Sequence, residues 1–149
     1  MKNMTLHHCA IMNDGKSHCS ILISEDASFF VPIILDNAEG AMVHSFLVGD
    51  EIEDSVLDNV LFIPESWKQL ESNMIAVELD FSDERTEVLA KICVHQKNEV
   101  KNKFTQLVTP MGYALIYSSH FSLPLYVDDC IVAQDRREIN QLESYLNNI

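Results

Sequence analysis

Chain-breaking residues and positive charge are both scarce in this sequence. It holds four glycines and four prolines in 149 residues, and 10 basic residues against 23 acidic ones. So few glycines and prolines exclude collagen-like and linker-like sequence, and each one that is present marks a turn or an element boundary. The formal charge of -13 opposes electrostatic binding of DNA or RNA, which depends on lysine and arginine displacing phosphate counterions.

Long apolar runs are missing as well. The longest, Phe29 to Leu35, is far below the ~20 residues of a membrane-spanning helix, so we expect no membrane partner. The first residues carry no apolar signal segment, and none of the four cysteines belongs to a Cys-x-x-Cys pair. We therefore expect a cytoplasmic protein whose thiols stay reduced.

The first part of the chain alternates short apolar-polar runs with turn residues. Leu6–Met12 and Ser17–Ser24 flank a turn at residues 13–16, which predicts a β-hairpin. Phe29–Leu35 is a third strand. Because Pro32 has no N–H, this strand belongs at a sheet edge or a bulge.

Two helices have end signals in the sequence. Asp36 or Asn37 caps the first, and Gly49 is placed to end it. Thr109 caps the second, with Pro110 at its first position. A further short helix ends near Asn73. The remaining strand predictions are 74–81, 86–95, 104–108 and 123–127. Together they predict an α+β domain with a mixed, largely antiparallel sheet built from hairpins and helices packed against it.

The C-terminal residues differ from the rest, so we divide the chain into a domain at 1–134 and a helical extension at 135–149. The segment Asp135–Glu138 has the spacing of a capping box at the start of that helix. A narrow apolar stripe follows, made of Ile139, Leu142, Leu146 and Ile149. Such a stripe packs either on its own domain or on a second copy of the chain.

Two segments resemble a known family. The residues Val31-Pro32-Ile33-Ile34-Leu35-Asp36-Asn37-Ala38-Glu39 look like its Leu-Pro-Ile strand leading into a helix with Glu and Ala, and Leu123-Pro124-Leu125-Tyr126-Val127 looks like its later Pro-Ile-Tyr-Val strand. The family is that of the bifunctional nuclease domains. The resemblance implies a bifunctional-nuclease-like fold and metal-dependent hydrolysis of nucleic acid, with Mg²⁺ or Mn²⁺ as cofactor.

The candidate site residues follow from the same resemblance and from the need for carboxylates to hold divalent metal. Glu39 and Asp80 are the catalytic candidates, and Glu39 and Asp36 are the metal ligands. Each has a structural alternative. Glu39 suits the positive end of a helix dipole, Asp36 suits a helix cap, and Asp80 lies beside a turn.

The sequence departs from the family at polar positions. The family has an Arg and an Asp where Thr109–Ala114 begins the late helix, and a His where Phe62–Trp67 stands, and this chain has none of the three there. The second hypothesis is therefore a non-catalytic interaction or regulatory module that forms a homo-oligomer.

The N-terminal hairpin gathers three histidines and two cysteines: His7, His8, Cys9, His18 and Cys19. Alternation along a strand sends neighbouring side chains to opposite faces, so only part of this set can converge. The usual interpretation is half-buried thiols and solvated imidazoles, and a zinc site is the minor alternative.

Overall fold

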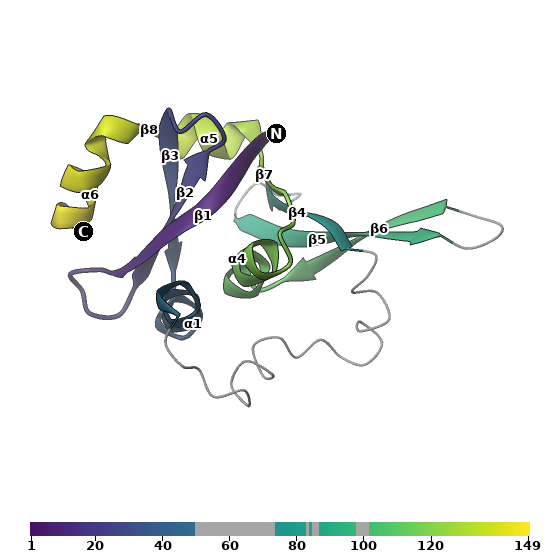
Figure 1. Cartoon of the computed structure of the whole chain (residues 1–149), viewed down its shortest axis with the longest axis horizontal. Helices are drawn as coiled ribbons and strands as arrows, with labels where there is room; N and C mark the ends of the chain where they lie inside the picture. Colours follow the sequence, from purple (N-terminus) through teal and green to yellow (C-terminus); the bar gives the residue numbers. More distant parts are fainter. Residues whose placement is uncertain (50–73, 83, 85–86, 98–101) are drawn as a thin grey trace.

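The computed structural model describes residues 1–49, 74–82, 84, 87–97 and 102–149 (Figure 1). The strands are β1 (Lys2–Ile11), β2 (His18–Ser24), β3 (Phe29–Leu35), β4 (Met74–Phe81), β5 (Val88–Lys97), β6 (Asn102–Thr109), β7 (Leu125–Val127) and β8 (Arg137–Glu138). The helices are α1 (Asn37–Val48), α4 (Met111–His120), α5 (Asp129–Asp135) and α6 (Leu142–Asn148), with a 3₁₀ turn at Ile139–Gln141.

All eight strands belong to one sheet, in the order β6-β5-β4-β7-β1-β2-β3-β8. Neighbours are antiparallel except β4 and β7, which run parallel. The predicted α+β class with a mixed, largely antiparallel sheet is therefore confirmed. The predicted helix ending near Asn73 lies outside the described residues. No helix in the described part of the chain has the length and apolar composition to cross a membrane.

The N-terminal hairpin and the first helix form for the local reasons that the sequence indicates. In the β1–β2 turn, Gly15 has a φ of 70°, and the Asp14 carboxylate accepts hydrogen bonds from the backbone amides that follow it. The Asp36 carboxylate accepts from the Glu39 amide at 2.8 Å to cap α1, which ends at Gly49 with a φ of 68°. The turn and the ends of α1 are as predicted, while β1 begins at Lys2, before the predicted start at Leu6.

The start of α4 differs from the prediction. Thr109 is the last residue of β6, where it pairs with Ala90, so Pro110 takes the cap position. Pro110 offers no capping side chain, so the predicted cap by Thr109 is wrong. The sheet holds the Thr109 backbone in extended form.

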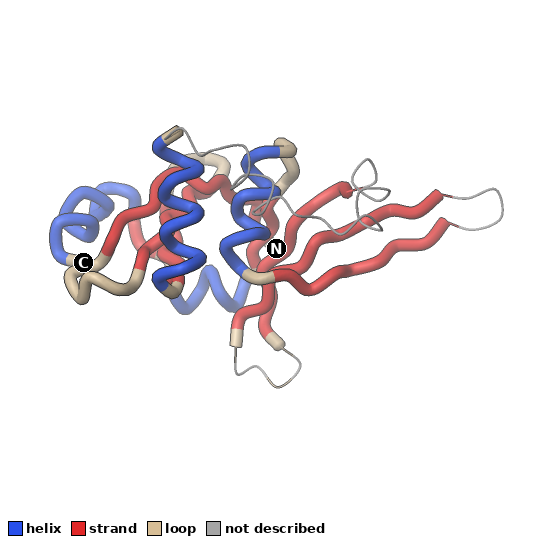
Figure 2. Tube along the Cα trace, turned by 90° about the horizontal axis from the view of Figure 1, so that it is seen from below, coloured by secondary structure: helices blue, strands red, loops and turns tan. Residues whose placement is uncertain are grey.

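Helices α1 and α4 lie side by side on one face of the sheet (Figure 2). Two glycines allow this close packing. A Cβ on Gly40 would lie 2.3 Å from the Cβ of His18 on β2, and one on Gly112 would lie 2.9 Å from the Cβ of Glu39. The main core fills the space between these helices and the sheet, and its largest fully buried members include Leu22, Val43, Val77, Leu79, Ile92, Leu115 and Ile116.

The C-terminal segment covers part of the opposite face. Cys19, Ile21 and Phe30 of β2 and β3 are fully buried there, under apolar residues of the segment: Ile139, Leu142, Tyr145, Leu146 and Ile149. The stripe thus packs on its own domain. The predicted capping box at Asp135–Glu138 is wrong, because α5 ends at Asp135 and the next residues pair with β3 as β8.

The contact of α1 with β2 predicts the effect of Gly40→Ala. Helix propensity alone favours alanine by up to about 1 kcal/mol. The clash with the Cβ of His18 costs more, so we expect a net loss of about 1–3 kcal/mol in the free energy of unfolding, measured by urea denaturation. The matched control is Ala41→Gly at the exposed neighbouring position, which loses only about 1 kcal/mol of propensity. A Gly40→Ala protein more stable than the wild type would contradict this packing.

The C-terminal cover predicts a change in thiol access. Cys19 is fully buried, with its Sγ 3.8 Å from the Tyr145 Oη. We expect Tyr145→Ala to speed alkylation of Cys19, followed residue by residue by mass spectrometry, and to cost about 1–3 kcal/mol of stability. The exposed Cys130 is the internal control, and its rate should not change. Unchanged labelling of Cys19 would mean that α6 does not shield it.

Candidate functional site

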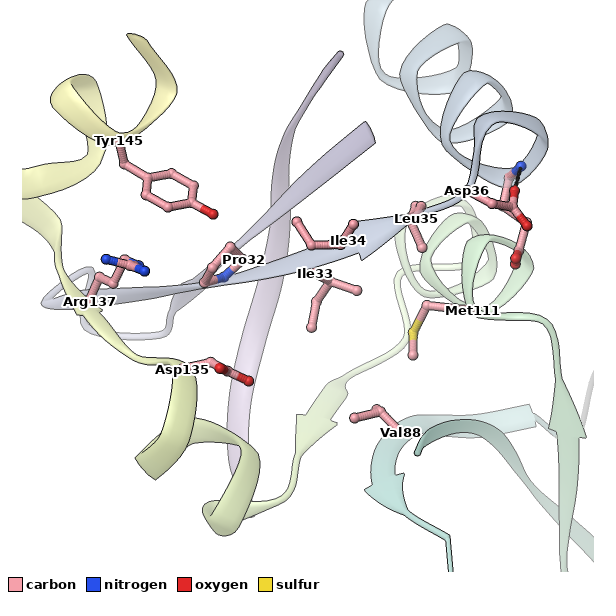
Figure 3. A pocket seen from close by; sticks show the side chains of 11 residues that line it. Pro32, Ile33, Ile34, Leu35, Asp36, Val88, Met111, Asp135, Arg137 and Tyr145 are labelled. Carbon is pink, nitrogen blue, oxygen red and sulfur yellow. Dashed lines mark hydrogen bonds between the residues drawn. The ribbon is translucent and has the colours of Figure 1, made fainter. Parts of the chain in front are cut away.

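An open groove of about 540 Å³ runs along β3 (Figure 3). Its floor is the strand itself, from Pro32 to Leu35. Met111 of α4 and Val88 of β5 form an apolar wall beside Ile33. The polar lining residues lie at the two ends, Asp36 and Glu39 at one and Asp135, Arg137 and Tyr145 at the other.

The strand beside this groove has an open edge. On the side away from β2, β8 pairs with Phe29 and Phe30 only, and the described residues place no other strand along the rest of that edge. The Ser28 carbonyl accepts from the Ile139 amide at 3.1 Å, so it points outward, away from β2. Because alternate residues of a strand direct their backbone groups to the same side, Pro32 and Ile34 also face outward. The missing N–H of Pro32 therefore falls on the open edge, and the prediction of an edge strand is confirmed for this half of β3.

Glu39 lies at one end of the groove and caps a helix other than its own. Its Oε1 accepts a hydrogen bond from the Gly112 amide at 2.8 Å, in the first turn of α4. An acid there is favoured by the free amides and by the dipole of that helix. The carboxylate thus replaces the side-chain cap that Pro110 does not provide. The structural alternative that the sequence offers for Glu39 is the dipole of its own helix, α1, and the hydrogen bond to the Gly112 amide is not predicted from the sequence.

The other two predicted site residues have different surroundings. Asp36 lines the groove beside Glu39 and caps α1. Asp80 does not line the groove. Its Oδ1 accepts from the Phe81 amide at 2.8 Å, and its Oδ2 lies 3.9 Å from the Lys91 Nζ. The fold therefore brings Asp36 and Glu39 together and leaves Asp80 apart.

The far end of the groove comes from residues that the sequence did not mark as site residues. The Arg137 guanidinium lies 4.8 Å from the centre of the Tyr145 ring. Burial, followed by the nearby Cys19, raises the pKa of Tyr145 to about 12, so its hydroxyl stays protonated at neutral pH. With Asp135 alongside, this end carries one charge of each sign, whereas the Asp36 end carries two negative charges.

The hairpin cysteines face opposite sides of the sheet. Cys9 pairs with Ser20 and Cys19 with Ala10, so Cys9 joins the main core and Cys19 lies under α6. Burial raises the pKa of both thiols, which favours the unreactive protonated form. Among the described residues, no group of three or more histidine, cysteine or acidic side chains is arranged to hold a metal ion.

In comparisons with known proteins, the sequence matches no family model and no curated protein.

Proposed function

We propose that this chain is a non-catalytic interaction module that binds its partner through the groove along β3. The observation that carries the proposal is the hydrogen bond from the Gly112 amide to Glu39. This bond gives Glu39, the main catalytic candidate, a structural role. The other two candidates have structural roles as well, because Asp36 caps α1 and Asp80 forms an ion pair with Lys91. The open edge of β3 provides backbone groups for a partner.

The proposed module is a divergent member of the bifunctional nuclease family. The two segments that carry the resemblance belong to the same sheet, as β3 and β7 with β1 and β2 between them, and the helices that adjoin them, α1 and α4, contact each other. This arrangement supports a common scaffold. The polar residues that differ from the family fit a scaffold that has kept its core and lost its chemistry.

A second candidate is a nuclease dependent on Mg²⁺ or Mn²⁺. It is favoured by the position of Asp36 and Glu39 on one groove, where each hydrogen bond uses a single carboxylate oxygen. Mg²⁺ is often held by one or two carboxylates together with substrate phosphates. The charge of -13 counts against this candidate, because it repels the phosphates.

Substitution of Glu39 separates the two candidates. As a cap, Glu39→Ala should lose about 0.5–2 kcal/mol of stability without any metal, and Glu39→Gln should lose less because its amide oxygen can still accept. We expect neither Mg²⁺ nor Mn²⁺ to raise the melting temperature of the wild type, and no cleavage of single- or double-stranded DNA or RNA. Metal-dependent cleavage by the wild type that disappears in Glu39→Gln would instead establish the nuclease.

The module also has a surface suited to self-association, and we propose that it forms a homo-oligomer through β6. This strand is the far edge of the sheet, and it extends with β5 beyond the helix layer (Figure 2). Phe104 and Val108 are four residues apart on the same face of this strand and are 71% and 60% exposed. Large exposed apolar side chains on an edge strand are typical of a contact surface.

Sedimentation velocity tests this oligomer. Because the subunits carry like charge, we expect association to strengthen between about 50 and about 500 mM NaCl as the repulsion is screened. Phe104→Ser should weaken association, and Ile11→Ser, which removes a similarly exposed apolar side chain from β1, should not. A monomer at every salt concentration would exclude the oligomer and leave the groove unaffected.

A further inference from the structure

We infer that the groove along β3 takes an extended peptide from a partner protein, added antiparallel to β3 with its basic residues at the N-terminal end. The inference rests on the proposed function, because it identifies the partner of the same groove. It depends on three features of the described residues: an edge that already receives a strand, an apolar wall, and an uneven distribution of charge.

The edge already pairs with a strand of this chain. β8 pairs antiparallel with Phe29 and Phe30, and the same register would continue opposite Pro32 and Ile34. The chain does not continue there, because residues up to Asp135 belong to α5. The outward carbonyl of Pro32 and the outward amide and carbonyl of Ile34 thus remain available to a peptide that extends the line of β8.

The wall determines which side chains fit. A peptide residue opposite Ile33 would place its side chain on the same face as Ile33, toward Val88 and Met111 (Figure 3). Its neighbours would point to the other face, where Ile34 is 54% exposed. The site therefore favours a peptide with alternating apolar and polar residues.

The charges determine at which end of the peptide the basic residues lie. An antiparallel peptide begins beside the C-terminal end of β3, where Asp36 and Glu39 line the groove. It ends near Asp135 and Arg137, whose charges offset each other. A chain with a charge of -13 attracts basic partners in general, and this end of the groove places the positive residues at the start of the peptide.

The test measures binding of a fluorescent, N-acetylated octapeptide in which two lysines precede alternating threonine and valine, by fluorescence anisotropy with the full chain. We expect binding that weakens by about 3- to 10-fold when the lysines are moved to the C-terminal end. N-methylation of the peptide amide that faces the Pro32 carbonyl should weaken it by a similar factor, since a backbone hydrogen bond is lost.

Protein variants locate the contact. Ile34→Pro removes the outward amide without touching the bonds to β2 and should weaken binding about 3- to 10-fold, while Ile34→Thr keeps the amide and serves as its control. Asp36→Asn with Glu39→Gln removes both charges, keeps both caps, and should weaken binding and reduce its salt dependence. The circular dichroism spectrum and the melting temperature of each variant establish that it is folded. Should Ile34→Pro fail to fold, the N-methylated peptide still tests the edge.

Three outcomes would overturn the inference. They are no binding of any peptide, equal binding of both lysine arrangements, and loss of self-association in Ile34→Pro, which would mean that a second copy occupies the edge. In each case, a chain that cleaves no nucleic acid and whose melting temperature does not change with Mg²⁺ or Mn²⁺ would still be consistent with the proposed interaction module. Metal-dependent cleavage of nucleic acid would remove the proposed function itself.

Discussion

The contact between α1 and α4 is the constraint on which the candidate site depends. Gly40 lets α1 lie directly on β2, and Gly112 lets α4 approach Glu39 closely enough for a hydrogen bond of 2.8 Å. The same carboxylate completes the first turn of α4 and provides one of the two negative charges at the end of the groove. A residue implied as catalytic by resemblance therefore has a sufficient structural reason to be an acid.

The C-terminal segment makes two different contacts with the sheet, and these leave part of the edge of β3 open. Arg137 and Glu138 pair with the edge of β3 as β8. The residues after them cross to the face of the sheet opposite α1 and α4, where they cover Cys19, Ile21 and Phe30. The residues that would continue β8 beyond Phe30 are those up to Asp135, and they belong to α5, so that part of the edge stays open. Pro32 fits this arrangement, because its missing N–H falls where no neighbouring strand needs it.

Elements with local signals were predicted well, and elements whose backbone is used by distant residues were not. The β1–β2 turn and the ends of α1 depend on side chains within three residues of the groups they satisfy, as Asp36 does for the Glu39 amide. Thr109 and the Asp135–Glu138 segment also have good capping chemistry. Both failed as caps because β5 and β3 hold the neighbouring backbone as strand, and no local pattern reveals those partners.

The residues of the candidate site also fall into those that the sequence predicts locally and those that only the folded structure brings to the groove. Asp36 and Glu39 follow β3 directly, so the sequence alone placed them together at the end of a strand, within one helical turn. Arg137 and Tyr145 reach the same groove only because the C-terminal segment folds back on β3. Local hydrogen bonds and periodicity determine where elements begin and end. Which helix Glu39 caps and which part of an edge stays open are decided by contacts between residues far apart in the chain, which only the folded structure brings together.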